Sequence, residues 1–271
     1  MSTCLNCDFD CIRQIVKPKT DNPFIITPDN AKNVKLDKDG NVNLKDDKVI
    51  PLKFSYIWIA NSQEDTISKL DTKTGDEVGR YKACSDPSRT AVDLVGDVWV
   101  GCRGDGGVMK IAGSKKNCVD KNGNGKIDTV EDKNKNKKIE AKEMFPYLKD
   151  ECVKFVVYPE GKGNWTSTPR AAGVDKDNFG WIGFWDKENL VKLHPQTGKK
   201  VDTIDLKCSP YGLAISKAGI IWIAGRGCGA LLRVDPKTKK VDNISYNEGS
   251  PYGMAIDSFG NVWMANTANA T

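Results

Sequence analysis

The chain has 271 residues, 39% of them hydrophobic and 28% charged, and its 41 basic and 36 acidic residues give a net charge of +5. This length permits a sizeable core in one domain, and the lack of a long apolar run argues against a transmembrane segment. Lysines are scattered through expected turns, so the basic excess indicates a solvated surface and no nucleic-acid binding. No secretory apolar stretch follows Met1, so we expect that any signal peptide was removed or never present.

The first segment, residues 1–32, holds three closely spaced cysteines, Cys4, Cys7 and Cys11. Their number is odd, so one of them could pair with a partner outside the chain. The alternative is a thiolate metal site, although the sequence has one histidine and offers no evident fourth ligand.

Residues 33–271 form a repeat that tryptophan marks. A tryptophan in near-identical surroundings recurs with gaps of 41, 82, 41 and 41 residues, at Trp58, Trp99, Trp181, Trp222 and Trp263. A period of about 40 to 50 residues is typical of propellers and other repeat folds. Each unit contains four short runs rich in β-branched and aromatic residues, separated by Gly, Pro, Asp and Lys turns. The sequence therefore predicts an all-β chain, a β-propeller of four-stranded blades.

The two ends of the repeat differ, because the first blade is expected to be complete and the last one is not. We expect the first blade to begin with a hairpin of residues 34–36 and 42–44. After Trp263 only residues 264–271 remain, too few for the third and fourth strands of a blade. The sequence thus holds about four and a half blades, which we expect to be part of a longer propeller, such as a seven-bladed one.

Within each unit, a proline opens the first strand and the tryptophan lies on the second. A strand start suits proline because no ladder partner is needed there. These prolines are Pro87, Pro169, Pro210 and Pro251. We expect the five indole rings to wedge between blades as core residues, since a ligand would use one ring and not five equivalent ones.

The 82-residue gap reflects an insertion, residues 112–151, within the second blade. It separates the third strand, 108–111, from the fourth, 152–158, which other blades join by a few residues. The insertion has few apolar residues, so we expect bound metal to act as a structural staple for it.

Two 12-residue units in the insertion match the spacing of a calcium (Ca²⁺) loop. The ligand positions of the first are Asp120, Asn122, Asn124, Lys126 through its carbonyl, Asp128 and Glu131. Those of the second are Asp132, Asn134, Asn136, Lys138 through its carbonyl, Glu140 and Glu143. Gly125 supplies the sharp turn of the first unit, and Lys137 replaces it in the second.

Ile127 and Ile139 fall in phase in these units and are expected to pack inward. The alternative is a solvated polar linker. No helix of useful length precedes Asp120, so the units are not a helix–loop–helix sensor. They resemble the tandem loops of dockerin or thrombospondin-type calcium modules.

Six cysteines occupy paired positions. Two pairs take matching places in two repeats and the third pair brackets the insertion: Cys84 with Cys102, Cys208 with Cys228, and Cys118 with Cys152. Paired placement predicts disulfides and an oxidising compartment: the extracellular space, the cell surface or the periplasm.

One end of the central channel is expected to collect polar, aromatic and arginine side chains. The residues that open the first strands should ring it as equivalents: Arg89, Arg170, Tyr211 and Tyr252. The loops after the second strands should lie at the same end, with Asn61, Arg103, Trp185, Arg226 and Asn266. Side chains gathered in this way at the end of the channel would form a ligand site. The alternative is that they are ordinary surface residues of loops, with no binding role.

The sequence nominates no catalytic residue. A nucleophile triad needs a base, and the single histidine, His194, stands at the opening of a turn where sister units have Asp71 and Asp235. We therefore interpret His194 as a turn residue.

The quoted repeat resembles the virginiamycin B lyase-like (streptogramin lyase) propellers, and more loosely the NHL-repeat and gluconolactonase-type propellers. The resemblance rests on proline–glycine first strands, the tryptophan on the second strand and the Asp-Pro turn, over residues 33–271 apart from the insertion. It implies a propeller. The lyases use a histidine and an acidic group with magnesium, and His194 lies in a turn, so that activity is not carried over.

These features predict a secreted or cell-surface propeller, stabilised by calcium and disulfides, that acts as a binding or structural module or as a subunit of an extracellular assembly. Its partner would be a protein or glycan ligand at the propeller face, or other copies through open blade edges. The alternative is a metal-dependent lyase or lactonase. Converging carboxylates with a metal in the channel would favour the enzyme, and Arg and Tyr lining would favour binding.

Overall fold

The computed structural model describes residues 34–36, 42–44, 55–163, 165–245 and 249–267, which belong to two units, Met1–Lys53 and Phe54–Thr271. In the first unit, β1 (Val34–Leu36) pairs with β2 (Val42–Leu44) as an antiparallel hairpin, as predicted. The hairpin is a two-stranded sheet. Cys4, Cys7 and Cys11 lie outside the described residues.

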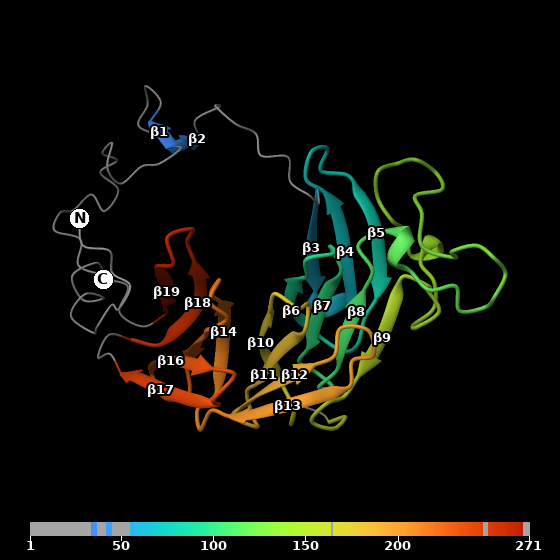
Figure 1. The fold of residues 1–271 in the computed structure, drawn as a ribbon. Coiled ribbons are helices and arrows are strands. Elements are labelled where there is room, and N and C mark those ends of the chain that lie inside the picture. The colour runs from blue at the N-terminus through green and yellow to red at the C-terminus, as the bar shows by residue number, and fades with distance from the viewer. Residues whose placement is uncertain (1–33, 37–41, 45–54, 164, 246–248, 268–271) are drawn as a thin grey trace. The chain divides into compact units, whose positions relative to one another are not determined.

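The second unit is a series of antiparallel sheets in chain order (Figure 1). The first has three strands, β3 (Tyr56–Asn61), β4 (Thr66–Asp71) and β5 (Glu77–Lys82). Three four-stranded sheets follow: β6 (Pro87–Val92), β7 (Val98–Cys102), β8 (Val108–Ile111) and β9 (Val153–Val157); β10 (Pro169–Val174), β11 (Gly180–Phe184), β12 (Asn189–Leu193) and β13 (Lys200–Asp205); β14 (Pro210–Ile215), β15 (Ile221–Gly225), β16 (Ala230–Asp235) and β17 (Lys240–Ser245). The last has two strands, β18 (Pro251–Ile256) and β19 (Val262–Asn266).

Each sheet is one blade, and the first strands of successive blades lie next to one another. β6 contacts β10, β10 contacts β14, and β14 contacts β18. The only helices in the described residues are short 3-10 turns, η1 (Ser62–Glu64), η2 (Lys115–Asn117) and η3 (Ala141–Glu143). The second unit is therefore an all-β propeller of four-stranded blades, as the tryptophan repeat predicted. The two-stranded last sheet is what the end of the repeat predicted, whereas the sheet of Trp58 has three described strands where a complete blade was expected.

Tryptophan on the second strand packs against the blade that follows. Trp99 is fully buried in a cluster with Ile182 and Phe184 of the next blade. A Cβ atom at Gly180 would lie 2.9 Å from the Trp99 ring, so only glycine permits this close approach. Trp58 and Trp181 are buried in the same way, which confirms the core role predicted for them.

The five tryptophans are not equivalent, contrary to our expectation. Trp222 is half-buried, and Trp263 is 57% exposed. Trp263 belongs to β19, and β18–β19 is the final sheet of the described residues, so no described blade covers its ring. Burial of the ring thus depends on the next blade and not on its own strand.

A basic residue of the third strand lies opposite four of the five tryptophans, a feature that the sequence interpretation missed. Four such cross-strand pairs occur: Trp58 with Lys69, Trp99 with Lys110, Trp181 with Lys192, and Trp222 with Arg233. The Lys110 ammonium lies 4.8 Å from the Trp99 ring centroid, and the Lys192 ammonium 5.2 Å from that of Trp181. Such cation–π contacts strengthen when the pair is removed from water.

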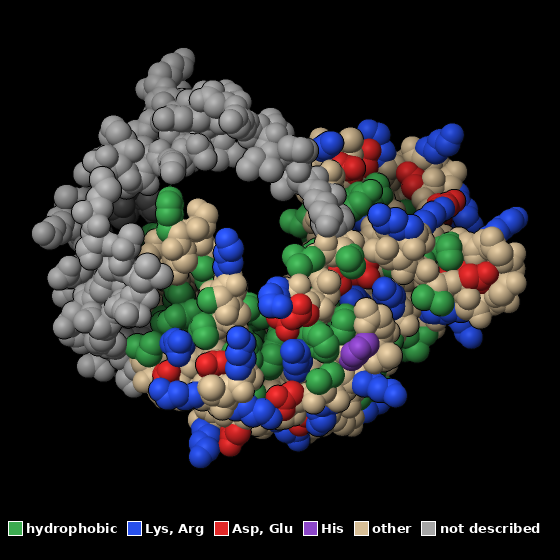
Figure 2. Space-filling view, viewed as in Figure 1, with side chains coloured by type: hydrophobic (Ala, Val, Ile, Leu, Met, Phe, Trp, Pro, Cys, Tyr) green, Lys and Arg blue, Asp and Glu red, His purple; other side chains and the backbone are tan. Residues whose placement is uncertain are grey.

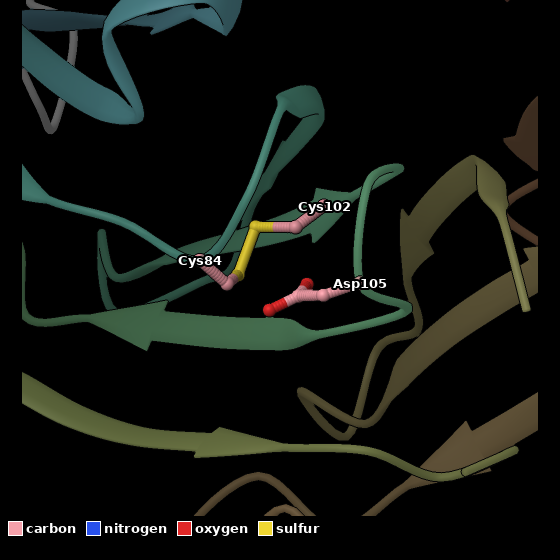
Figure 3. A group of neighbouring side chains, drawn as sticks. All are labelled: Cys84, Cys102 and Asp105. Atoms are coloured by element: carbon pink, nitrogen blue, oxygen red, sulfur yellow. A yellow bond between two sulfur atoms is a disulfide. The ribbon is translucent and has the colours of Figure 1, made fainter. Parts of the chain in front are cut away.

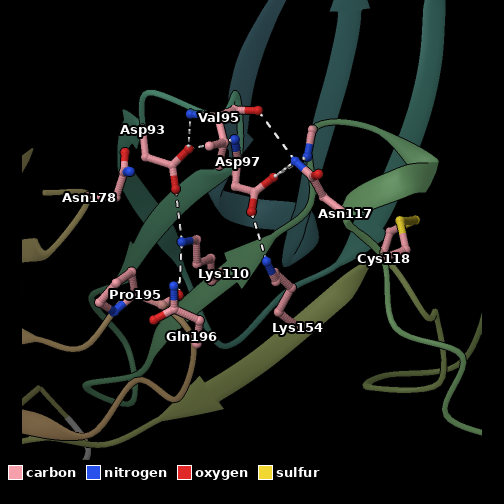
Figure 4. A network of polar contacts seen from close by, with 12 residues as sticks. Asp93, Val95, Asp97, Lys110, Asn117, Cys118, Lys154, Asn178, Pro195 and Gln196 are labelled. Carbon is pink, nitrogen blue, oxygen red and sulfur yellow. Dashed lines mark hydrogen bonds and ion pairs between the residues drawn. A yellow bond between two sulfur atoms is a disulfide. The ribbon is translucent and has the colours of Figure 1, made fainter.

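The buried lysine of the second blade ties two blades together (Figure 4). The Lys110 ammonium is 2.8 Å from Asp93 Oδ2 and donates a hydrogen bond of 2.9 Å to the Pro195 carbonyl of the next blade. Both charged side chains are almost completely buried. A second pair, Lys154 with Asp97 at 2.9 Å, lies beside it. These groups leave water only because each charge has a partner.

Disulfides join the three pairs of cysteines that the sequence predicted. The bonds are Cys84–Cys102, Cys118–Cys152 and Cys208–Cys228. The first and third connect the entry of a blade to the end or loop of its second strand, and the second closes the base of the insertion. Three disulfides are compatible with an extracellular or periplasmic location.

The Lys110–Asp93 pair gives a stability prediction. Lys110→Met leaves the buried Asp93 carboxylate without its partner, so we expect the free energy of unfolding to fall by about 3–5 kcal/mol. Lys176→Met is the matched control, because that side chain is 79% exposed and its change should stay within about 0.5 kcal/mol. Denaturant unfolding measures both. Equal stability of the two variants would show that the buried pair does not hold the blades.

Candidate functional site

A β-bulge follows the proline that opens each first strand from β6 onward. Pairing shifts register just after Pro87, Pro169, Pro210 and Pro251. Bulges are frequent beside functional sites because they turn a side chain away from the regular alternation of the strand. The residues directly after the prolines, in these bulges, are Ser88, Arg170, Tyr211 and Tyr252, and the last two bulges also contain Gly212 and Gly253.

Arg89 is not the equivalent of the other three predicted ligand residues. Its pairing partner is Gly101, whereas the residue immediately after the proline is Ser88. Arg89 therefore takes the place that Ala171 has in the next blade. It still reaches the same site, because its Nε donates a hydrogen bond of 2.7 Å to the Arg170 carbonyl.

The four predicted ligand residues meet around the ring of Tyr211. The guanidinium carbons of Arg170 and Arg89 lie 4.3 Å and 4.6 Å from its centroid. The Tyr252 ring is 4.2 Å away, and the two tyrosine hydroxyl groups are hydrogen-bonded at 2.7 Å. Arg170 also donates a hydrogen bond to the Tyr211 hydroxyl. The convergence that the sequence predicted for these residues is therefore present.

Two of the predicted second-strand loops contribute to the same cluster. The Arg226 guanidinium lies 5.1 Å from the Tyr211 ring, and Trp185 meets that ring edge-on at 6.1 Å. Cys228 lies two residues after Arg226, so the Cys208–Cys228 bond restrains the loop that carries this arginine. Arg103, by contrast, is paired with Asp86 at 2.6 Å.

Tyr211 lines two hollows. The larger has a volume of about 440 Å³ and is lined by Trp165, Thr168, Arg170, Trp185, Asp186, Tyr211 and Arg226. The smaller, of about 250 Å³, lies between Arg89, Tyr211 and Tyr252. Thr168 and Trp165 come from the segment that leads into β10, which the sequence interpretation did not associate with the site. We call the larger hollow the rim cavity.

The arginines around Tyr211 carry a positive charge that no described carboxylate neutralises. Within the described residues, Arg89, Arg170 and Arg226 form no ion pair. Asp186 lines the rim cavity, is exposed, and accepts a hydrogen bond of 2.9 Å from the Thr168 amide. Burial lowers the pKa of Arg170, although a guanidinium remains charged at any physiological pH.

The charge of the arginines acts on Tyr211 itself. Burial alone raises the pKa of this phenol, but the hydrogen bond to Tyr252 and the positive charge of Arg170 and Arg89 outweigh it and lower the pKa below its usual value. The site therefore favours negative charge at its centre.

In the first predicted calcium loop, backbone amides converge on the carboxylate at position 1. Asp120 accepts hydrogen bonds from the Gly123 and Gly125 amides at 2.7 Å and 2.8 Å. The Gly125 amide holds the pKa of Asp120 below its usual range, so this carboxylate is ionised at neutral pH. Asn122 and Asn124 both donate to Asp128 Oδ2, so the side chains at positions 3, 5 and 9 converge.

Glu131, predicted at position 12 of this loop, is placed elsewhere. It is exposed and its carboxylate is ion-paired with Lys115. Glu151, which is 2% exposed, is bound to the loop instead. It accepts hydrogen bonds of 2.8 Å from the amides of Lys121 and Asp128, at positions 2 and 9.

In the second loop, the glutamate at position 12 of the unit, Glu143, makes the contacts that Glu151 makes in the first loop. Glu143 accepts hydrogen bonds from the Lys133 and Glu140 amides, again positions 2 and 9, at 3.0 Å and 2.9 Å. Asp132 accepts from the Asn136 and Lys137 amides, as position 1 should. Glu151 in the first loop therefore matches Glu143 in the second. The sequence could not show this because Glu151 lies outside the 12-residue unit.

The remaining predicted ligands of the second loop also face one another. Asn134 and Asn136 donate hydrogen bonds to the Glu140 carboxylate, at 3.2 Å and 3.4 Å. Lys126 and Lys138, whose carbonyls are the predicted ligands at position 7, donate their amides to Asn124 and Asn136. The oxygen-rich donor set of both loops fits a hard cation such as calcium.

The insertion packs on the blade before it. Ile139 is buried, and its amide donates a hydrogen bond of 2.9 Å to Glu77 of β5. Ile127 is partly buried against the same core, so both isoleucines point inward as predicted. An ordered insertion therefore connects the first two sheets of the second unit.

Within the described residues, one group of His, Cys, Asp or Glu ligand atoms is close enough to share a metal ion: Cys84, Cys102 and Asp105 (Figure 3). The two sulfur atoms are bonded to each other, so neither is a thiolate. Asp105 is occupied by the Tyr158 hydroxyl and the Gly107 amide, both at 3.1 Å. This group is a structural contact and not a metal centre.

His194 lies in a turn, as predicted. Its amide donates to the Lys199 carbonyl, and its Nδ1 accepts a hydrogen bond of 3.3 Å from the Gln196 amide. It does not line the rim cavity.

Figure 2 shows basic and acidic side chains interspersed on the face in view. None of the helices in the described residues has the length and apolar character needed to cross a bilayer.

No family model and no curated protein matches this sequence. Solved structures match in fold. Virginiamycin B lyase from Staphylococcus aureus superposes with a TM-score of 0.52 and 13% identity over 86% of this chain and 69% of that chain. Hydrazine synthase from Kuenenia stuttgartiensis gives 0.54 and 15%, over 79% and 54%. The Pan2 WD40 domain of Neurospora crassa gives 0.52 and 8%, over 80% and 57%.

At these identities the likeness shows the propeller fold alone. The chain spans little more than half the length of two of these structures and about two thirds of the other. Their names cover unrelated activities, so the function of this chain has to be argued from its own residues.

The lowered pKa of Tyr211 can be measured directly. We expect one tyrosine of the folded protein to ionise at lower pH than the others, and Tyr211→Phe to remove that early phase of tyrosinate absorbance. Because the folded state favours the ionised phenol, its contribution to stability is absent below the folded pKa and grows as pH rises towards the unfolded value. Tyr147→Phe is the control, because burial raises the pKa of that phenol. An early phase that survives Tyr211→Phe would contradict the assignment.

Proposed function

We propose that this protein is an extracytoplasmic binding module, a calcium-stabilised and disulfide-linked propeller that takes an anionic ligand at its rim. The observation that carries the proposal is the set of three arginines without an ion-pair partner, Arg89, Arg170 and Arg226, around the Tyr211 ring. Clustered positive charge without counter-ions is costly unless something negative binds there.

Binding is favoured over the alternative of a metal-dependent lyase or lactonase. That alternative calls for carboxylates converging in the channel, whereas the described lining of the rim cavity has two arginines, a tyrosine and a single carboxylate, Asp186. Two tryptophans and a tyrosine provide the apolar walls typical of a ligand pocket.

The proposal includes calcium in the two loops of the insertion. Asp120, Asn122, Asn124, Asp128 and Glu151 would hold it in the first loop, where it would supply the cohesion that the polar insertion lacks. The contact of Ile139 with Glu77 means that an insertion ordered in this way would also brace the neighbouring blade.

The rim proposal is tested with inorganic sulfate as a simple anion. We expect saturable binding to the whole chain, followed by tryptophan fluorescence or calorimetry, that weakens as ionic strength rises. Arg226→Ala should lower the affinity about tenfold, since a hydrogen bond to a charged group is lost. Arg233→Ala, in the same blade but outside the cavity, is the matched control. An Arg226→Ala protein that binds sulfate as tightly as the control would refute the rim site.

The calcium proposal is tested by comparing two glutamates. Glu151→Gln should weaken calcium binding by the first loop about tenfold or more, because the charged ligand is lost, while Glu131→Gln should change it little. Calorimetric titration of calcium into chelator-treated protein measures both, and calcium should raise the melting temperature of the wild type. If Glu131→Gln weakened calcium binding and Glu151→Gln did not, the acidic ligand would be Glu131 of the 12-residue unit and the proposed role of Glu151 would be wrong.

A further inference from the structure

We infer that the rim cavity recognises a sugar acid: a hydroxylated ring that bears one carboxylate, as in a uronic acid. This inference rests on the proposed function and gives the anionic ligand a chemical class. It follows from the arrangement of three kinds of side chain around one cavity of about 440 Å³.

The first kind is the pair of arginines. Arg170 and Arg226 both line the cavity, and both guanidinium groups lie within 5.1 Å of the Tyr211 ring centroid. A guanidinium is a planar fork of donors that matches the two oxygens of a carboxylate. Contact with the Tyr211 ring restrains both side chains, so less side-chain freedom is lost when an anion binds.

The second kind is aromatic. Trp185 and Trp165 line the same cavity, and Trp185 is held edge-on against Tyr211 at 6.1 Å. Trp165 is 54% exposed and lies under the Arg103 guanidinium. Indole rings at the wall of an open cavity offer apolar area to the C–H groups of a sugar ring and do not require the ligand to be buried. A bare inorganic anion would leave these faces unused.

The third kind is a hydrogen-bond acceptor. Asp186 lines the cavity and forms no ion pair with a described residue, although Arg170 and Arg226 line that cavity too. One of its oxygens accepts the Thr168 amide, and an ionised carboxylate has about four lone-pair sites, so it can accept further hydrogen bonds. The Asp186 carboxylate would repel an anionic ligand unless that ligand also donated hydrogen bonds to it. The hydroxyl groups of a sugar ring are such donors.

Together these groups require an anion, a ring and hydroxyl donors in one small molecule. Acetate supplies only the first, glucose the last two, and benzoate the first two. A uronate supplies all three. The smaller hollow, with Arg89 beside the shared Tyr211, offers room and charge for a second acidic sugar.

The test is calorimetric titration of the whole chain with glucuronate, galacturonate, glucose, acetate, benzoate and sulfate. We expect a uronate to bind at least about tenfold more tightly than acetate or benzoate, and glucose not to bind measurably. Oligogalacturonate is the arm that separates a free sugar acid from an acidic polysaccharide: tighter binding than the monomer identifies the polymer as the source.

Three variants assign the contacts. Arg226→Ala should lower the affinity for the uronate and for sulfate by about tenfold each. Trp185→Ala should weaken the uronate and leave sulfate unchanged. Asp186→Asn should reduce the preference for the uronate over benzoate while strengthening sulfate binding, because a negative charge is removed. Arg233→Ala is again the control.

The outcomes separate the two proposals. If sulfate binds through Arg226 but the uronate binds no more tightly than acetate, and Trp185→Ala has no effect, the sugar-acid inference is wrong and the anion site stands. If neither anion binds while the melting curve shows a folded protein, both are wrong. Arg170→Ala repeats the test should Arg226→Ala fail to fold.

Discussion

The structure depends on one contact between blades: an indole ring from the second strand of each blade rests on the blade that follows, with a basic side chain of the third strand beside it. Trp99 and Lys110 show it fully, since the ring lies against Gly180 and the ammonium reaches the Pro195 carbonyl of the next blade. Apolar burial and a partnered charge act at the same interface, so each blade is fixed relative to its neighbour. Trp263, without a described neighbour, is largely exposed.

Fixed blades hold the rim site in place. The first strands of neighbouring blades lie against one another, and each carries a bulge directly after its opening proline. The bulges bring Arg170, Tyr211 and Tyr252 together from three blades, and a disulfide restrains the loop of Arg226. The arginines therefore remain close without neutralising carboxylates, because the scaffold and the Tyr211 ring hold them there.

Sequence periodicity was sufficient to predict the blades, the first-strand prolines, the disulfides and the meeting of arginines and tyrosines, because these follow from residues that repeat in register. Contacts made by residues that do not repeat in register were not predictable in this way. Glu151 reaches the first loop from beyond the insertion's own repeat. Arg89 stands one residue further from its opening proline than its supposed equivalents do, because Ser88 lies between them. One missed signal was visible: a lysine or arginine follows four of the tryptophans at the same spacing, as in Trp99 and Lys110.

The bulge after each proline has an evolutionary consequence. A bulged residue is left out of the regular ladder pairing, so its identity is under little pressure from the sheet that carries it. Serine, arginine and tyrosine already occupy this place in different blades of one chain. A lineage could therefore exchange what the mouth of the propeller binds, one blade at a time, while the architecture beneath is inherited unchanged.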